Sequence, residues 1–284
     1  MDRTILMSRL MVIVVELKAK GMMMAIHYFR IVVLAFLLVA SIYGQAYAVD
    51  NNKLMAALVK AYPEFLAGHD SDDLIWKDGT RMRFDDDRTD KNFETLLNAP
   101  SIKDMFYARY MPGIMSDVPD IDIDPGRIRY EPFFTKMYGD CKKGEPSRFL
   151  VEIVWLPRKW GKKIRITRVN GVAEQLSKVS HELDLLPPEF DKYLFPPAGT
   201  MNCRPIAGTK RQSAHGCAIA IDIAQKYSDY WRWAKPGTGG HYKYRNRIPY
   251  EIVQIFEKHG FIWGGKWYHY DTMHFEYRPE LLIQ

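Results

Sequence analysis

The sequence predicts an α+β fold. A small, mainly antiparallel sheet carries helices on one face and a metal site on the other, with an N-terminal extension before it. Bulky and small residues alternate over residues 218–223, which is the period of two typical of a strand. Two hydrophobic runs, 149–156 and 164–169, flank a Gly-containing turn and predict a hairpin. Apolar residues recur at helical spacing over 172–186 and 249–259, and a Pro or Gly follows each run.

Shorter elements are predicted further upstream. A helical rhythm covers residues 53–66, a hairpin over 74–84 turns at Asp78-Gly79, and a short helix is expected over 92–99. The run Asp85–Asp87 lacks the alternating oxygen ligands and the glycine of a calcium loop. We therefore interpret it as a solvated acidic turn.

Residues 111–127 are rich in Pro, Gly and Asp without periodicity and are predicted to form a loop. This loop is either a rim over a site or a boundary. In the second case it separates an extension of unknown role (49–140) from the main domain (141–284). The sequence does not decide between the two.

Residues 1–48 are predicted to be a secretory signal peptide. A basic flank at His27–Arg30 precedes the apolar run Ile31–Ala40, and an Ala-x-Ala pattern follows at Ala46–Ala48. A membrane anchor is the competing interpretation, but this run is shorter than the ~20 residues of a spanning helix. Because another apolar run precedes the flank, we expect translation to start near Met22–Met24. The mature protein would then be exported, to the periplasm or out of the cell, without a stable membrane anchor.

The composition is that of a globular protein with a sizeable core, since 47% of the 284 residues are hydrophobic and 26% are charged. Without residues 1–48, 35 Lys and Arg face 32 Asp and Glu, and the net charge of +6 falls to +3. This mild excess suits an anionic polymer but is also an ordinary solubility charge. No stripe of Lys and Arg is interleaved with aromatic residues, so nucleic acid is not expected as a partner.

The three cysteines are Cys141, Cys203 and Cys217. In an oxidising compartment one pair can form and one thiol is left over. Cys217 lies on the bulky side of the strand pattern, so we expect it to be a buried free thiol and Cys141–Cys203 to be the bridge. No C-x-x-C spacing supports a cysteine zinc site.

The segment Ser213–Asp222 has one face suited to an ion. Ala218, Ala220 and Asp222 alternate with isoleucines, and these small residues leave room above the sheet. His215 lies seven residues before Asp222, an odd offset that would place the two on opposite faces of a straight strand. The chain is therefore expected to bend near Gly216, a residue suited to unusual dihedral angles.

The segment Trp267–Glu276 supplies a second histidine. His274 and Glu276 share one face of a predicted strand, and Asp271 lies in the turn that enters it. Together the two segments offer two imidazoles and one carboxylate, with a further carboxylate beside the last imidazole. This set suits a catalytic zinc ion, which takes three nitrogen or oxygen ligands and leaves a fourth position for water.

The pattern S-x-H-x-x-x-x-x-x-D, followed about fifty residues later by D-x-x-H-F, resembles a known peptidase family. This is the zinc D,D-carboxypeptidase and L-alanyl-D-glutamate endopeptidase family, which includes the vancomycin-resistance D,D-peptidases and several phage endolysins. The resemblance covers roughly residues 170–280. It implies that His215, Asp222 and His274 bind Zn²⁺ and that Asp271 is the general base. The implied substrate is the peptide stem of peptidoglycan, cut at a D-alanine bond or at the L-Ala–D-Glu link.

The same family carries an arginine, on a strand before its first histidine, that stabilises the substrate carbonyl in the transition state. By this resemblance Arg204 is the candidate, because it begins an Arg-Pro-Ile run, and Arg211 is the alternative. The interval from Arg204 to His215 is shorter than in the family pattern. An arginine that pairs with a surface carboxylate is the competing interpretation.

Three other histidines and an aromatic run lie near the motifs or in the helix before them. His269 is expected to contact the site indirectly or to bind substrate rather than the metal. His241, in a Gly-rich loop, and His181, on the polar side of a helix, are expected to face solvent. The aromatic run Tyr227–Trp233 forms either a wall for glycan or peptide stems or a part of the core.

Two functions from other classes stay open. One is a cell-wall-binding protein that keeps the fold and the metal without chemistry, and it would bind sacculi without releasing peptides. The other is a metal-dependent hydrolase of a different amide, such as a soluble dipeptide. The presence of Asp271 argues against an inactive protein, but the sequence does not identify the bond that is cut.

Overall fold

The structure is a computed structural model that describes residues 50–283. The predicted signal peptide (1–48) and the predicted start near Met22–Met24 lie outside these residues. Among the described residues, no helix combines the length and the apolar character needed to cross a membrane.

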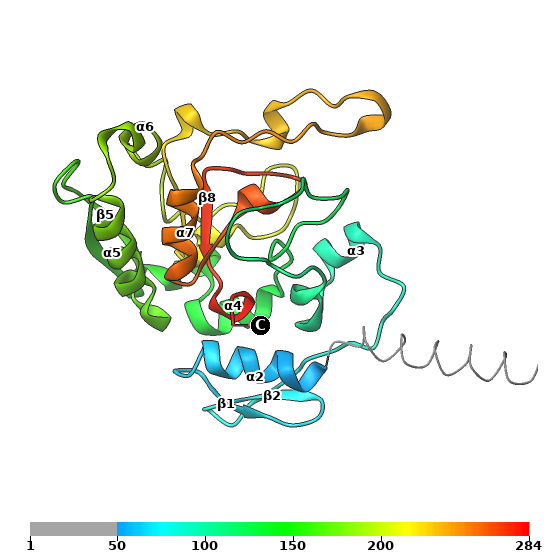
Figure 1. Cartoon of the computed structure of the whole chain (residues 1–284). Coiled ribbons are helices and arrows are strands. Elements are labelled where there is room, and N and C mark those ends of the chain that lie inside the picture. Colours follow the sequence, from blue (N-terminus) through cyan, green and yellow to red (C-terminus); the bar gives the residue numbers. More distant parts are fainter. Residues whose placement is uncertain (1–49, 284) are drawn as a thin grey trace, which may run out of the picture. The chain divides into compact units, whose positions relative to one another are not determined.

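A three-stranded antiparallel sheet lies at the centre of the C-terminal half (Figure 1). Its strands are β6 (Ala220–Asp222), β8 (His274–Tyr277) and β7 (Phe261–Trp263), paired in that order. The register sets Asp222 directly opposite His274. The sheet therefore joins two segments that lie far apart in the sequence.

Helices cover one face of this sheet. In α7 (Tyr250–Lys258) the buried side chain of Phe256 stacks on Phe275 of β8, with ring centroids 3.8 Å apart. Helix α5 (Val172–Leu183) packs beside α7, and Figure 1 shows α7 running alongside β8. His274 and Glu276 alternate with Phe275 and lie on the opposite face. The predicted α+β fold, with helices on one face and the polar site on the other, is confirmed.

The predicted hairpin before α5 is also present. Strands β4 (Leu150–Trp155) and β5 (Lys162–Thr167) pair along their whole length in antiparallel register. Ser180 of α5 accepts a hydrogen bond from the backbone N–H of Leu156, at 2.8 Å. This bond fixes the helix against the end of β4.

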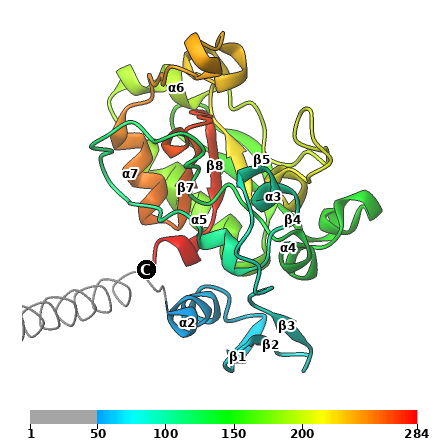
Figure 2. The same cartoon turned by 90° about the vertical axis from the view of Figure 1, so that its right-hand side faces the viewer.

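The upstream region, residues 51–140, begins with a helix and another three-stranded sheet (Figure 2). Helix α2 (Asn51–Ala61) packs against β1 (Leu66–His69), which pairs with β2 (Asp73–Trp76) and then β3 (Arg81–Arg83). The β2–β3 turn at Asp78-Gly79 agrees with the predicted hairpin, and Gly79 has a φ of 82°. The helix ends earlier than the predicted 66, because Pro63 disfavours helical dihedrals in the residue before it.

Three short helices complete the fold. The predicted helix over 92–99 is α3 (Phe93–Asn98), and the side chain of Asn92 caps it by accepting a hydrogen bond from the Thr95 backbone N–H. Two others, α4 (Glu131–Tyr138) and α6 (Asp191–Leu194), were not predicted.

The cysteines are paired as the sequence suggests. Cys141 and Cys203 form a disulfide, and Cys217 is a buried free thiol. The bridge ties the end of α4 to the chain that leads into the His215 segment.

From Asn51 onward the chain forms one compact unit. Buried side chains on both sides of residue 140, such as Leu58 and Ile219, belong to a single hydrophobic cluster. The division into 49–140 and 141–284 therefore stays a prediction, and the boundary it proposes falls within a shared core.

We expect Leu58→Ala to lower the free energy of unfolding by about 2–5 kcal/mol, because Leu58 is fully buried in this cluster. The exposed Lys53→Ala on the same helix is the control. Urea denaturation of Leu58→Ala should show a single unfolding transition whose midpoint lies at a lower urea concentration than in the wild type. Two transitions, of which only one moves, would show that the upstream region folds separately.

Candidate metal centre

Three side chains converge on the open face of the β6–β8 pair. His215 Nε2 lies 3.1 Å from Asp222 Oδ1, and His274 Nδ1 lies 3.0 Å from the same oxygen. The donor atoms of all three lie within 4.8 Å of one another. The structure thus brings together the three residues that the sequence singled out as metal ligands.

A bend in the chain brings His215 to the face occupied by Asp222. A turn of 3-10 helix over Ala214–Cys217 precedes the strand, and Ala218 then adopts a left-handed conformation with φ 55°. The predicted bend near Gly216 exists, but the left-handed dihedral angles belong to Ala218 and not to Gly216. A Cβ at Gly216 would lie 2.3 Å from Gln212 Nε2 and 3.0 Å from Cys141 Sγ, so the Gln212 side chain would have to move to admit it.

The outer nitrogen of each imidazole has its own partner. His215 Nδ1 lies 2.7 Å from the carbonyl oxygen of Thr200, and His274 Nε2 lies 3.1 Å from Glu276 Oε2. Such contacts orient a ring and select the nitrogen that is left to bind a metal. They leave His215 Nε2 and His274 Nδ1 directed at Asp222. The sequence placed Glu276 beside His274 but did not assign it this role.

The electrostatics of the site favour positive charge. Burial alone would raise the pKa of Asp222, but His215 and His274 outweigh it and hold that pKa well below its usual range. Burial alone would lower the pKa of His274, but hydrogen bonds to Asp222 and Glu276 raise it to about 10. Two carboxylates therefore stabilise a cationic group at this point, and a metal ion is such a group.

The three converging side chains line a cavity, and Asp271 lines it too. Its Oδ1 is buried and has no hydrogen-bond partner among the described residues. Burial, together with the negative charge of Asp222, raises the pKa of Asp271 to about 6. A buried acceptor without a partner is costly, so a ligand or water at the centre would complete its hydrogen bonding. The donor set and this acceptor fit a metal with a bound water.

Arg204 lines this cavity, which we call the metal-site cavity. The chain after Arg204 folds back on itself, and the backbone N–H of Ser213 donates to the Arg204 carbonyl at 3.2 Å. This reversal explains how so short an interval places Arg204 near His215. In the part of the chain that the structure describes, Arg204 forms no ion pair, so the surface-pairing interpretation is not supported. The alternative, Arg211, lines a neighbouring cavity instead.

Two further arginines line the metal-site cavity and were missed from the sequence. Arg127 pairs with Asp124 at 3.1 Å, and Arg129 pairs with Glu276 at 2.8 Å. They follow Gly126, whose φ is 82° and where a Cβ would lie 2.4 Å from Ile262. The alternation of arginines around Ile128 was the available signal. The end of the 111–127 loop thus forms part of the cavity wall, which favours its interpretation as a rim.

Residues 207–277 match a model of the D-alanyl-D-alanine carboxypeptidase family. This segment is a domain of that family. The match confirms the resemblance recognised in the sequence, and it includes the three converging residues and Asp271. No curated protein and no solved structure matches the chain. Arg204 lies three residues before the matched segment, whereas Arg127 and Arg129 lie far upstream of it.

The other histidines near the carboxypeptidase-family domain lie outside the converging group. His269 Nδ1 lies 2.8 Å from Asp124 Oδ2, and its ring stacks on Phe93 with centroids 5.6 Å apart. It therefore supports the loop that carries Arg127. His241 and His181 are exposed, as expected.

The aromatic run Tyr227–Trp233 forms part of the cavity wall, and none of its aromatic side chains is fully buried. Tyr230 lines the metal-site cavity, and Trp231 packs between Arg127 and Tyr242. Trp233, by contrast, is 53% exposed. The run therefore contributes a wall near the site and continues to the surface.

We expect Glu276→Gln to weaken metal affinity about 10- to 100-fold, because His274 loses the carboxylate that orients its ring. His274→Ala should abolish binding, while Glu152→Gln, on the exposed side of β4, should not change it. Calorimetric titration with Zn²⁺ measures the affinity, and circular dichroism checks that each variant is folded. A folded Glu276→Gln with unchanged affinity would contradict the role given to Glu276.

Proposed function

We propose that the protein is a zinc-dependent peptidase that cleaves the peptide stems of peptidoglycan. It would act as a D,D-carboxypeptidase or as an L-Ala–D-Glu-type endopeptidase. The observation that carries the proposal is the convergence of His215, Asp222 and His274 beside the unpartnered carboxylate of Asp271, within a carboxypeptidase-family domain.

The donor set supports zinc over other ions. Two imidazole nitrogens and one carboxylate oxygen leave a fourth position for water or substrate, which is the arrangement of catalytic zinc sites. Calcium and magnesium favour sites built from oxygen ligands. His215, Asp222 and His274 would hold the ion through Nε2, Oδ1 and Nδ1.

The chemistry divides between the metal and the protein. Zinc, when bound, supplies Lewis acidity and lowers the pKa of a bound water toward about 7. Asp271 is placed to take the proton of the attacking water on its free Oδ1 and to return it to the leaving amine. The charge of a nearby cation favours the ionised carboxylate that this role requires.

Arg204 is the group that stabilises the transition state in this proposal. Arg204 is an exposed residue of the cavity wall and has no carboxylate partner among the described residues, so its guanidinium is available to donate to the developing oxyanion. Tyr230 and Trp267 form other walls of the same cavity and present aromatic surface to it.

The proposed location agrees with the proposed substrate. A signal peptide over residues 1–48 would export the protein, to the periplasm or out of the cell, where peptidoglycan lies. The net charge of +3 expected after its removal suits an anionic wall. Of the two alternatives, a wall-binding protein has no use for a buried, unpartnered carboxylate at Asp271. A hydrolase of soluble dipeptides would share the same site and is separated only by its substrates.

We expect Asp271→Ala to keep the metal and to lose about 100- to 10,000-fold in turnover, because the general base is removed. His215→Ala should lose both the metal and the activity, because it removes a donor. Elemental analysis gives the metal content, and chromatography of peptides released from sacculi gives the rate. Near-normal turnover in Asp271→Ala would refute the assignment of the base.

The substrate is tested by mass spectrometry of the peptides that residues 49–284 release from purified peptidoglycan, with and without a chelator. We expect products that disappear with the chelator and return with Zn²⁺, and their termini identify the bond. Sacculi bound without product would favour the wall-binding protein. Turnover of dipeptides alone would favour the soluble amidase.

A further inference from the structure

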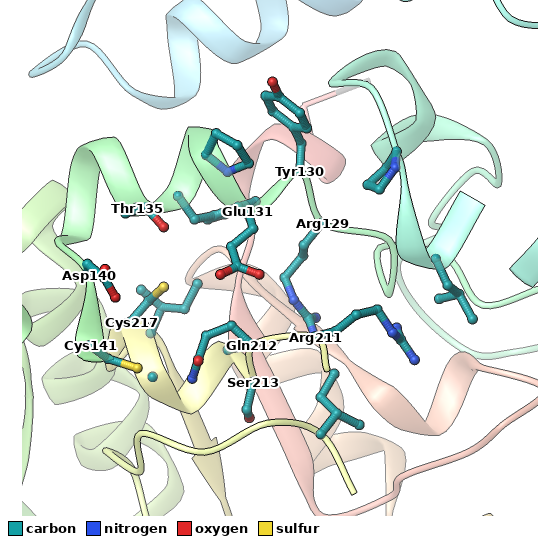
Figure 3. A pocket seen from close by; sticks show the side chains of 18 of the residues that line it. Arg129, Tyr130, Glu131, Thr135, Asp140, Cys141, Arg211, Gln212, Ser213 and Cys217 are labelled. Carbon is teal, nitrogen blue, oxygen red and sulfur yellow. The ribbon is translucent and has the colours of Figure 1, made fainter. Parts of the chain in front are cut away.

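A second cavity adjoins the metal-site cavity and shares Arg127, Arg129 and Ser213 with it (Figure 3). We call it the arginine pocket, because Arg211 joins the two shared arginines in its wall. Figure 3 shows Arg129 and Arg211 close together at one side of this pocket.

The three guanidinium groups differ in their partners. Arg127 is paired with Asp124 and Arg129 with Glu276. Arg211 has neither an ion pair nor a side-chain hydrogen bond within residues 50–283, and its Nε is buried. Burial and the charges of the neighbouring arginines lower the pKa of Arg211 to about 10, which still leaves it charged at neutral pH. The pocket therefore contains one partly buried positive charge that has no ion-pair partner among residues 50–283.

The acidic residues of the pocket do not supply the missing partner. Glu131 contributes a carboxylate to the pocket, where its nearest cationic group is Lys142 Nζ, at 3.9 Å. Asp140 accepts a hydrogen bond from the backbone N–H of Lys142 at 2.9 Å and lies 3.9 Å from Lys143 Nζ. Neither carboxylate comes within 4.0 Å of Arg211. Because the buried Nε of Arg211 has no acceptor and the guanidinium has no counter-ion, an anion bound here would stabilise the pocket.

The remaining walls define the kind of anion. Phe134, Ile206 and Ile219 line the pocket and present apolar surface. Guanidinium groups bind carboxylates through paired hydrogen bonds of matching geometry. The combination of apolar walls and one free guanidinium suits an aliphatic chain that ends in a carboxylate.

We propose that the arginine pocket is a carboxylate-binding subsite, in which Arg211 binds a second acidic group of the substrate peptide while the scissile bond lies in the metal-site cavity. The identity of the ligand as a peptide rests on the proposed function, whereas carboxylate binding itself does not. This carboxylate is either the C-terminal carboxylate of the peptide or the side-chain carboxylate of an acidic residue within it.

The subsite would also give the upstream region a function. Arg127 and Arg129 precede the matched segment 207–277, and Phe134 belongs to α4, which also precedes it. The pocket is thus assembled from both parts of the chain. Substrate selection would depend on residues outside the family domain.

The test uses the zinc-loaded protein and two pairs of peptides. In one pair the C-terminal carboxylate is replaced by a carboxamide. In the other pair the side-chain carboxylate of an internal acidic residue is replaced by a carboxamide. We expect one of the two replacements to raise KM roughly 10- to 100-fold, the size of a hydrogen bond to a charged group, and so to identify the source. Arg211→Gln should raise KM for the acid by a similar factor and leave the amide unchanged. Arg165→Gln, an exposed arginine on β5, is the matched control.

A second measurement separates failure of the subsite from failure of the proposed function. N-acetyl-D-glutamate is titrated into the metal-free protein and followed by NMR. We expect saturable shifts in the wild type and in Arg165→Gln that are lost in Arg211→Gln. If no peptide is cut, the proposed function fails and this titration alone decides the subsite. The subsite would be overturned if acid and amide peptides were cut equally well and the titration gave no saturable shifts. It would also be overturned if inorganic phosphate bound more tightly than N-acetyl-D-glutamate.

Discussion

The register between β6 and β8 is the constraint on which the site depends. It sets Asp222 opposite His274, and a shift of one residue would turn His274 toward α7 and Phe275 toward the cavity. The packing of Phe256 on Phe275 resists such a shift, because the apolar face is closed by a helix. Burial on one face thus fixes the position of the donors on the other.

Buried charge links this register to the rest of the molecule. Glu276, two residues after His274, is fully buried and is held by Arg129 and Arg278. Arg278 in turn binds Glu280, at 2.5 Å. Buried ions are stable only when they are paired and hydrogen-bonded. Glu276, Arg278 and Glu280 therefore form a series in which each charge requires its neighbour.

The series ends in the upstream region. The hydroxyl of Tyr62, which follows α2, donates to Glu280 at 2.6 Å. The hydrogen-bonded series therefore runs from α2 to the ring of His274. Together with the common hydrophobic cluster, it explains physically why residues 51–140 fold against the family domain rather than apart from it.

Local patterns in the sequence predicted much of this arrangement. Strand β6 and helix α7 follow from periodicity, although the strand covers only Ala220–Asp222 of the predicted 218–223. The metal donors follow from the motif that carries the family resemblance. Each of these signals lies within a short stretch of chain, where spacing alone determines the face that a residue occupies.

The features that were missed depend on contacts between distant segments. Ala218 takes the left-handed conformation where the turn over Ala214–Cys217 meets the strand, and nothing in its own residue type indicates this. Arg127 and Arg129 reach the site through a loop without periodicity. The role of Glu276 became visible only when its partners were placed around it.

We infer that one metal ion binds between β6 and β8. Diffraction from zinc-soaked crystals, recorded on both sides of the zinc absorption edge, would locate this ion. We expect a single anomalous peak about 2.0–2.2 Å from His215 Nε2, Asp222 Oδ1 and His274 Nδ1. A peak elsewhere, or one bound through His274 Nε2, would contradict it.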